Sequence, residues 1–241
     1  MVNALILAGD RGEEGYSKAL LKIKGRFMIE YLIDALKSSN TVKNIYVVGD
    51  EVLREMIKNY YDGYILSNGE MLENIKKGIR EIGDYDTPVL ICTADIPLVS
   101  GEAIRDFVVE CENKDIDVGY PIIDKSLNDE KYPDVKRTYV KLKEGTFTGG
   151  NIVYLNPKVI ERATEKAAEL IAYRKKPLKM GQVLGVTFLL RLALGVLTIE
   201  AVERKVCDMF DIRGRAILTK YPEIGNDVDK IEDIEFVNRY L

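Results

Sequence analysis

Residues 2–25 read VNALILAGDRGEEGYSKALLKIKG, so an apolar strand leads directly into a charged loop that contains glycines and ends near a lysine. Val2 and residues 4–7 form an apolar run with no polar face, which is typical of a central parallel strand covered by helices on both sides. In open parallel sheets, ligands bind beyond the carboxyl ends of the strands. This order of parts therefore predicts an α/β sheet whose first strand ends at a binding loop.

The loop itself has the features of a phosphate-binding segment. Gly9 and Gly12 let the backbone turn sharply and bring its N–H groups close to an anion. Arg11 and Lys18 add positive charge, since an ammonium acts as a point charge and a guanidinium can grip two oxygens. The glycine spacing matches neither the dinucleotide-binding fingerprint nor the P-loop, so a plain connection between strand and helix is the alternative.

A second strand end carries a carboxylate. Residues 88–98 read PVLICTADIPL, an apolar run that ends at Asp95, where Pro97 prevents a helix from starting at once. An acidic group beside a triphosphate is repulsive unless a divalent cation lies between them, so the pairing implies Mg²⁺, which prefers oxygen ligands. A helix cap at Asp95 is the alternative, although Ser100 is better placed to cap the helix predicted for EAIRDFVVE.

Helices and strands alternate along the first two thirds of the chain, as in proteins built on a parallel sheet. We expect an α/β fold with a three-layer, Rossmann-like, mostly parallel sheet and helices on both faces. The charged segment DKSLNDEKYPD is expected to be a connection, either a mobile loop over the site or a solvated link. The predicted helices are 27–36, 51–60 and 70–82, and the further predicted strands are 44–48, 64–66, 116–123 and 137–142.

A third strand end also carries polar residues. Ser67, Asn68 and Gly69 follow a short predicted strand and precede the helix that begins near residue 70. Such residues often do no more than cap a helix, which is the alternative to a binding role here. If these residues have a binding role, their loop lies in the same cleft as Gly9 and Asp95.

Three motifs, in the same order along most of the chain, resemble those of the MobA-like nucleotidyltransferases, which share the nucleotide-diphospho-sugar transferase (GT-A type) fold. LILAG with Lys18 resembles the N-terminal signature of that family, and TADIPL resembles its metal-aspartate strand end. DVDKIEDI (227–234) is similar to the C-terminal element that supplies a second metal ligand, and TGGNIVYLNP (148–157) is similar to the acceptor-side strand.

The resemblance implies a set of site residues. Asp95 and Lys18 would be the catalytic pair, and Asp227 would join Asp95 at the metal, with Asp229 as the alternative ligand. The family loop usually has a small residue where this chain has Asp10, which makes Lys18 the main triphosphate contact. The implied nucleotide site comprises Leu7, Ala8, Gly9, Arg11, Gly12, Lys18, Asn68, Gly69 and Asn74, and the implied acceptor side comprises Thr148, Gly149, Gly150 and Asn151.

Composition excludes several kinds of chemistry. Basic and acidic residues, 35 and 39 in number, are spread along the chain and give no sign of a nucleic-acid surface. The three cysteines lack the spacing of a zinc site or a disulfide framework. With no histidine, catalytic triads that need one are excluded, as are histidine-ligated metals. The first residues lack the basic region of a signal peptide, so a cytoplasmic location is expected.

Residues 156–214 are predicted to be consecutive helices without a strand between them. We expect a nucleotide-binding α/β core at 1–155, a helical subdomain at 156–214 that faces a dimer partner, the acceptor or a membrane, and a last strand and helix at 215–241 that return to the core. The apolar stretch 183–197 contains Arg191, which argues against a transmembrane span. We favour a buried helix or a homodimer contact through 181–199 over peripheral contact with anionic lipid.

The sequence therefore predicts a Mg²⁺-dependent nucleotidyltransferase. It would transfer a nucleoside monophosphate from an NTP, with GTP or CTP favoured, to a small phosphorylated or hydroxylated acceptor and release pyrophosphate. Two alternatives remain: a nucleotide-sugar-dependent glycosyltransferase of the same fold, which usually shows a DxD motif at the strand end, and a non-catalytic nucleotide-binding scaffold.

Overall fold

The computed structural model describes residues 1–10, 15–173, 177–230 and 232–241. Its principal feature is one mixed sheet with the strand order β5-β4-β1-β6-β10-β7-β9-β8, in which β11 pairs with the free side of β7. The strands of this sheet are β1 (Val2–Leu7), β4 (Val42–Gly49), β5 (Gly63–Leu66), β6 (Val89–Thr93), β7 (Val118–Asp124), β8 (Val140–Lys141), β9 (Thr146–Gly149), β10 (Ile152–Leu155) and β11 (Gly214–Thr219). A separate hairpin consists of β2 (Lys22–Ile23) and β3 (Arg26–Phe27).

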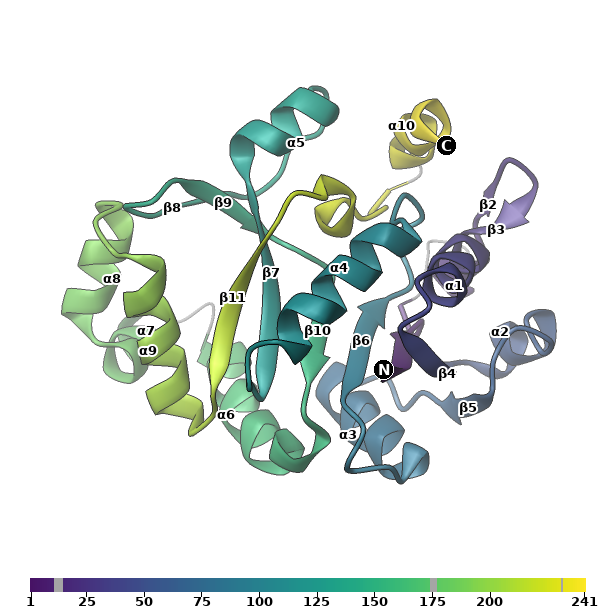
Figure 1. Cartoon of the computed structure of the whole chain (residues 1–241), viewed down its shortest axis with the longest axis horizontal. Helices are drawn as coiled ribbons and strands as arrows, with labels where there is room; N and C mark the ends of the chain where they lie inside the picture. Colours follow the sequence, from purple (N-terminus) through teal and green to yellow (C-terminus); the bar gives the residue numbers. More distant parts are fainter. Residues whose placement is uncertain (11–14, 174–176, 231) are drawn as a thin grey trace.

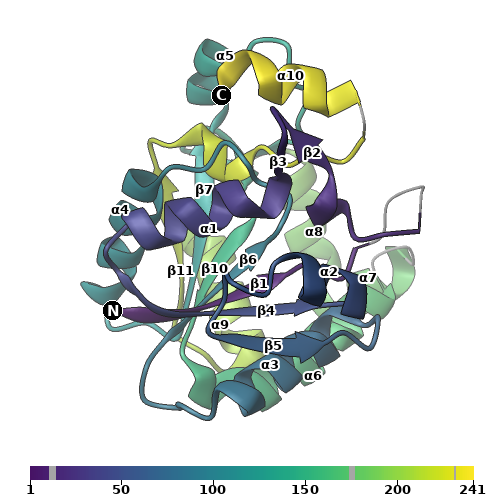
Figure 2. The same cartoon turned by 90° about the vertical axis from the view of Figure 1, so that its right-hand side faces the viewer.

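Helices cover both faces of the sheet, so the fold has the three layers that the sequence predicts (Figures 1 and 2). The α-helices are α1 (Met28–Ser38), α2 (Glu51–Met56), α3 (Met71–Ile82), α4 (Gly101–Glu112), α5 (Lys125–Lys131), α6 (Ile160–Tyr173), α7 (Pro177–Leu184), α8 (Val186–Ala193), α9 (Ile199–Phe210) and α10 (Glu232–Tyr240). Among the described residues, short 3-10 turns lie at Lys18–Leu20, Pro157–Val159 and Pro222–Gly225. None of the described helices is long and apolar enough to cross a membrane.

The two faces of the central strands have separate cores. Ala4 and Ile6 of β1 face the helices α1, α2 and α4, where Ile33 and Phe107 are fully buried. Leu5, on the opposite face of the same strand, packs in a second core with residues of α3 and α6. Because both faces of β1 are buried, its sequence is apolar apart from Asn3.

The parallel part of the sheet matches the prediction from the sequence. β1 pairs in parallel with β4 on one side and with β6 on the other, so it is the central strand that its apolar run indicates. β10 lies between β6 and β7 and runs antiparallel to both of them, so the sheet is mixed. The predicted strand within 148–157 is two strands, β9 and β10, with Gly150 and Asn151 between them.

Three local predictions were wrong. The segment DKSLNDEKYPD contains the helix α5, which Asp124 caps by accepting a hydrogen bond from the Ser126 N–H at 2.8 Å. The predicted strand at 137–142 is reduced to the two residues of β8. The helix predicted at 51–60 ends at Met56, and the backbone continues as turns.

The apolar stretch 183–197 is not one buried helix. Gly185 has φ +91°, a left-handed conformation that favours glycine, and it separates α7 from α8. α8 has no buried residue, and the side chains of Val186, Leu190 and Leu194 are 64%, 60% and 72% exposed. The interpretation as a buried helix is therefore wrong for α8. In the described part of the chain, β10 and β11 are joined by helices without an intervening strand, as predicted.

Candidate active site

The two strand ends singled out in the sequence lie at the same edge of the sheet. Leu7, the last residue of β1, is paired in register with Thr93, the last residue of β6. The Ala94 N–H donates to the Leu7 carbonyl at 3.1 Å, which fixes the turn that leads to Asp95. The Gly9 loop and Asp95 are therefore neighbours, as the parallel-sheet argument predicts.

A cavity of about 250 Å³ occupies this edge of the sheet. It brings together five of the predicted site residues, from three separate strand ends and the first turns of α3. Its lining residues are Leu7, Gly9, Asp10, Val48, Gly69, Met71, Asn74, Thr93 and Asp95. Val48, Met71 and Thr93 were not predicted as site residues, and none of them has a sequence signal beyond its position near a strand end or a helix start.

Three carboxylates converge beside this cavity. One oxygen from each of Asp95, Asp227 and Asp229 lies within 4.8 Å of the other two. Asp227 and Asp229 reach Asp95 because the Val228 N–H donates to the Asp95 carbonyl at 2.8 Å. That bond joins two segments more than 130 residues apart in the chain, and it brings all three predicted metal ligands together.

The chemistry of this cluster fits a hard divalent cation. Burial raises the pKa of Asp95 to about 6, and the charge of Asp227 contributes to the increase. Asp95 Oδ1 is a buried atom without a hydrogen-bond partner. Such an orphaned carboxylate oxygen is costly unless a cation compensates it, and an all-oxygen donor set is what Mg²⁺ prefers.

Arg137 is a neighbour that the sequence analysis missed. Its Nη1 group forms an ion pair with Asp227 Oδ1, and its Nε atom is buried without a hydrogen-bond partner. The Asn151 side-chain amide also donates to Asp227 Oδ1, at 3.4 Å. Arg137 falls in a stretch predicted as a strand, and nothing local in its sequence indicates a contact with residue 227.

The loop that was predicted to bind phosphate is anchored by another residue that the sequence analysis did not single out. The Ser17 hydroxyl donates to the Ala8 carbonyl at 2.7 Å, and the same oxygen accepts from the Ala19 N–H at 3.3 Å. Lys18 is the next residue after Ser17, and its ammonium lies 3.6 Å from the Asp10 carboxylate. Arg11 and Gly12, also predicted for this loop, lie outside the described residues.

Asn74 organises the third strand end. Its Oδ1 accepts from the Asn68 N–H, and its Nδ2 donates to the Ser67 hydroxyl, each at 2.9 Å. The Ser67 hydroxyl also accepts from the N–H of Gly69, a residue with φ +92°. A Cβ at Gly9 would lie 2.8 Å from the Ser67 hydroxyl, so the first loop needs glycine in order to approach this one.

The four residues predicted for the acceptor side are divided between two places. Asn151 lies beside Asp227, and its backbone carbonyl accepts from the Thr93 N–H at 3.1 Å. Thr148 and Gly149 instead line a cavity farther along the sheet. The missing side chain of Gly150 has a packing reason, because a Cβ there would lie 2.6 Å from Ile224 Cγ2.

The chain matches the family model of the MobA-like NTP transferase domain over residues 4–184. Among curated proteins, it is 28% identical over 148 residues to an adenosylcobinamide-phosphate guanylyltransferase from Methanocaldococcus jannaschii, a match that covers 55% of this chain and 72% of that protein. It is 31% identical over 113 residues to the bifunctional protein GlmU from Thermoanaerobacter pseudethanolicus, which covers 43% of this chain and only 24% of GlmU.

Solved structures support the same relationship. A hypothetical transferase from Thermus thermophilus superposes with a TM-score of 0.86 and 33% identity, covering 97% of this chain and all of that one. A CMP:2-keto-3-deoxy-manno-octonic acid synthetase complexed with CTP shares the fold, with a TM-score of 0.62 and 12% identity over 99% of this chain and 97% of that one. On its matched residues and its fold, the chain belongs to the MobA-like NTP transferase family.

Proposed function

We propose that this protein transfers a nucleoside monophosphate from an NTP to a small phosphorylated or hydroxylated acceptor and releases pyrophosphate, in a reaction that depends on Mg²⁺. The observation that carries the proposal is the group of three carboxylates beside the cavity at the end of β1 and β6. Phosphoryl chemistry depends mainly on positioning and on neutralising charge, and this arrangement offers both.

The loop after β1 would bind the triphosphate. Gly9 lines the cavity, so backbone N–H groups of this loop would meet the phosphates there, and Lys18 would supply the cationic contact. Lys18 is held near the site by Asp10, an exposed partner that a triphosphate would displace. The predicted contacts of Arg11 and Gly12 remain part of this proposal.

Asp95 and Asp227 would hold the metal ion, with Asp229 as a third candidate ligand. When bound, Mg²⁺ would stabilise the negative charge that develops on the α-phosphate and the departing pyrophosphate. Arg137 would be released from Asp227 as that carboxylate turns to the cation, and its guanidinium would then orient a phosphate oxygen. The Asn151 amide donates to Asp227 and would remain a neutral partner of that carboxylate after Arg137 is released.

A phosphate acceptor would need no general base, because a phosphomonoester is already an anion at neutral pH. For the donor, we propose GTP or CTP. The named relatives support this choice, since one is a guanylyltransferase and another, from Frankia casuarinae, is 2-C-methyl-D-erythritol 4-phosphate cytidylyltransferase. The loop ordered by Asn74 would meet the base and ribose.

We further propose that residues 156–214 form a subdomain beside a nucleotide-binding core of residues 1–155, with residues 215–241 returning to that core. The exposed apolar side chains of α8 make residues 181–199 the best candidate for a homodimer contact, with peripheral membrane contact as the other interpretation. Substituting Leu190 by Glu and measuring the molar mass by light scattering tests the dimer.

The proposed function is tested by incubating the protein with each of the four NTPs, Mg²⁺ and a panel of phosphomonoesters and alcohols. Pyrophosphate release and a nucleotide-linked product, identified by mass spectrometry, are expected with one NTP and are expected to disappear with EDTA. Consumption of a nucleotide-sugar instead would favour a glycosyltransferase. Tight NTP binding without turnover of any acceptor would favour a non-catalytic scaffold.

A further inference from the structure

A second cavity borders the candidate active site on the face of the sheet covered by α3 and α6. Its volume is about 400 Å³, and it shares Leu7, Met71 and Thr93 with the cavity of about 250 Å³ at the ends of β1 and β6. Asn151 also lines it, and the amide of that residue contacts Asp227. One end of this second cavity therefore lies beside the first cavity and next to Asn151, a neighbour of the carboxylate cluster.

The walls of the second cavity are apolar. Ile91 and Val153 come from the sheet, and Ile160, Ala163 and Phe210 come from the helices above it. No charged side chain lines this cavity within the described part of the chain. An occupant that enters it leaves water for hydrocarbon surroundings.

The few polar groups of this cavity are concentrated at the end beside the carboxylates. The Thr93 hydroxyl lacks a hydrogen-bond partner, and Asn151 lies next to Asp227. Thr164 also lines the cavity, but its hydroxyl donates to the Ile160 carbonyl of its own helix at 2.8 Å. The cavity thus has one polar end and an apolar body.

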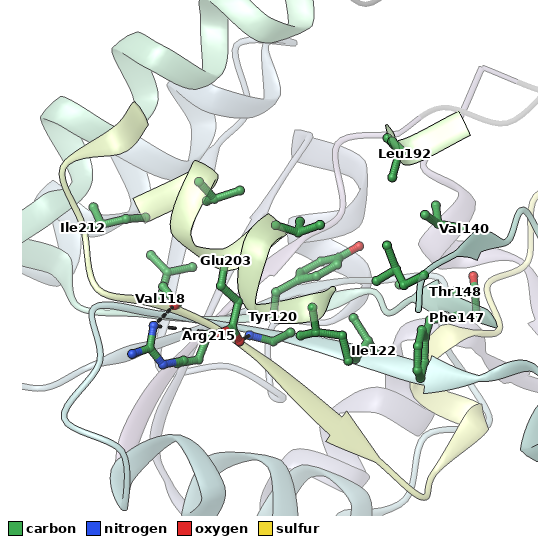
Figure 3. A pocket seen from close by; sticks show the side chains of 17 residues that line it. Val118, Tyr120, Ile122, Val140, Phe147, Thr148, Leu192, Glu203, Ile212 and Arg215 are labelled. Carbon is green, nitrogen blue, oxygen red and sulfur yellow. Dashed lines mark hydrogen bonds and ion pairs between the residues drawn. The ribbon is translucent and has the colours of Figure 1, made fainter. Parts of the chain in front are cut away.

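A third cavity, of about 580 Å³, continues the apolar surface between α9 and the strands β7, β9 and β11. The third cavity shares Val118 and Ile212 with the second cavity. These two residues lie at one end of the third cavity, and Val140 and Phe147 lie at its opposite end (Figure 3). The two cavities together lead from the carboxylate cluster along the sheet towards α8.

The charged side chains of the third cavity are already engaged. Glu203 accepts a hydrogen bond from the Ala216 N–H of the edge strand β11 at 2.7 Å, and Arg215 donates to the Gly214 carbonyl at 2.9 Å. The two side chains also lie 4.0 Å apart, as the dashed line in Figure 3 marks. They offer no free charge to a ligand, so this cavity also suits a hydrocarbon.

An acceptor rich in hydroxyl groups or ring nitrogens would lose hydrogen bonds to water in these cavities and gain few in return. A hydrocarbon chain, in contrast, gains free energy with every methylene that it buries. The site next to Asp95 and Asp227 requires a nucleophilic oxygen, and Arg137 favours an anionic one. The acceptor best matched to all three features is therefore amphiphilic.

We propose that the acceptor is the phosphate monoester of an aliphatic alcohol, with its phosphate beside Asp227 and Arg137 and its chain in the apolar cavities. This inference rests on the proposed function. A phosphate oxygen of the acceptor attacks the α-phosphorus of the NTP, a new P–O bond forms, and the bond to the bridging α–β oxygen breaks. Pyrophosphate leaves with that electron pair, and the product is an alkyl nucleoside diphosphate.

The direct test is a chain-length series of acceptors. Glycerol phosphate, butyl phosphate, octyl phosphate and dodecyl phosphate are compared with Mg²⁺ and the best NTP, each below its micelle-forming concentration. We expect kcat/KM to rise about fourfold for each methylene added until the cavity is filled. Equal or better turnover of glycerol phosphate would overturn the inference. This series uses the wild-type protein and does not depend on the folding of a variant.

A pair of substitutions on α6 tests whether the second cavity is the cause of the dependence on chain length. Ala163→Phe places a ring in the second cavity, whereas Ala168→Phe adds the same ring to an exposed position of the same helix. We expect the first variant to lose the dependence on chain length and the second to retain it. Retention of the full dependence in Ala163→Phe would contradict the assigned path.

A binding measurement separates this inference from the proposed function. Calorimetry is performed with dodecyl phosphate in the presence of Mg²⁺ and an NTP analogue whose α–β bridge is a methylene. If the analogue does not bind, the proposed function fails. If the analogue binds but dodecyl phosphate binds no better than glycerol phosphate, only the inference about the acceptor fails.

Discussion

Arg137 forms an ion pair with Asp227, so one of the three clustered carboxylates is held by a guanidinium from a different segment of the chain. The Arg137 Nε atom lacks a partner, and so does Asp95 Oδ1 on the other side of the cluster. A buried group of this kind is costly until a ligand satisfies it. The two orphaned atoms therefore indicate where a cation and an anionic substrate would bind together.

The first prediction concerns the substitution Arg137→Met. We expect the affinity for Mn²⁺, measured by electron paramagnetic resonance without nucleotide, to increase by at least about fivefold, because a positive charge is removed from the carboxylates. We expect turnover to fall at least tenfold because the proposed acceptor phosphate would lose its guanidinium contact. Arg54→Met is the matched control, since Arg54 is exposed on α2 and pairs with Glu51. Weaker metal binding in Arg137→Met would contradict this account.

The second prediction compares Lys18 and Asp10, two residues of the loop after β1 that we propose binds the triphosphate. Lys18→Ala is expected to weaken NTP binding by about 10-fold to 100-fold, the usual loss when a charge-assisted hydrogen bond is removed. Asp10→Asn is expected to leave binding unchanged or tighter, because it removes a negative charge next to the triphosphate. Titration calorimetry measures both. If Asp10→Asn weakened binding as much as Lys18→Ala, the ion pair itself would be the important feature.

The third prediction concerns Asn74, whose amide orders the loop of Ser67 to Gly69. Asn74→Ala leaves the Asn68 N–H and the Ser67 hydroxyl without this partner, so we expect a loss of about 1–3 kcal/mol in the free energy of unfolding. We also expect the ratio of affinities for the preferred and the other NTPs to decrease. Glu73→Ala, an exposed neighbour on the same helix, is the control. An unchanged affinity ratio would remove this loop from base recognition.

The fourth prediction concerns pH. Hydrogen bonds from Arg213 lower the pKa of Asp117, a buried residue that joins the start of β7 to the start of β11. The interaction between Asp117 and Arg213 therefore stabilises the folded protein above about pH 4, the ordinary pKa range of an aspartate. This stabilisation is lost as the pH falls below that range. We expect Asp117→Asn to destabilise the protein by about 1 kcal/mol at pH 7, because Arg213 is half exposed.

The loss in Asp117→Asn is expected to shrink as the pH falls below about 4, because the unfolded wild-type carboxyl group is then protonated while the folded one, with its lowered pKa, still resists protonation. Urea unfolding at pH 7 and pH 3 measures this change. Asp115→Asn is the control, because Asp115 contacts the same arginine but is 91% exposed. A destabilisation by Asp117→Asn that is equal at both pH values would show that packing, and not charge, is responsible.

Strand ends could be predicted from the sequence because their signals are local. The apolar run before Gly9 and the one before Asp95 each indicate a buried parallel strand, and the rule for open sheets then places both ends at one edge. Ser100 was likewise predicted as a helix cap, and its hydroxyl accepts from the Ala103 N–H at 3.1 Å. In these cases neighbouring residues alone determine the structure.

Other features depend on contacts between distant segments. Arg137 contacts a residue 90 positions away, so its own neighbourhood gave no indication of that role. α5 is polar in sequence, yet Asn128 within it is fully buried and accepts from the Asn226 amide at 3.1 Å. Gly185 breaks an apolar stretch that has the composition of one buried helix, because its left-handed backbone conformation interrupts the helical hydrogen bonds.

The measurement that tests the central claim most directly is a thermal-shift comparison of the wild type with Asp95→Asn at pH 8, with GTP or CTP and with or without Mg²⁺. Asn has nearly the same shape, and it relieves the cost of burying a charge, so we expect the ligand-free variant to be at least as stable as the wild type. Asp86→Asn, in the exposed loop before the same strand, serves as the control.

For the wild type and Asp86→Asn, a nucleotide at a hundred times its dissociation constant should add about 2.7 kcal/mol of stability, and each kcal/mol raises the melting temperature by about 2 to 4 °C. That shift should require Mg²⁺, and it should be absent in Asp95→Asn. A Mg²⁺-dependent shift of the same size in Asp95→Asn would contradict the assignment of this carboxylate as the metal ligand on which catalysis depends.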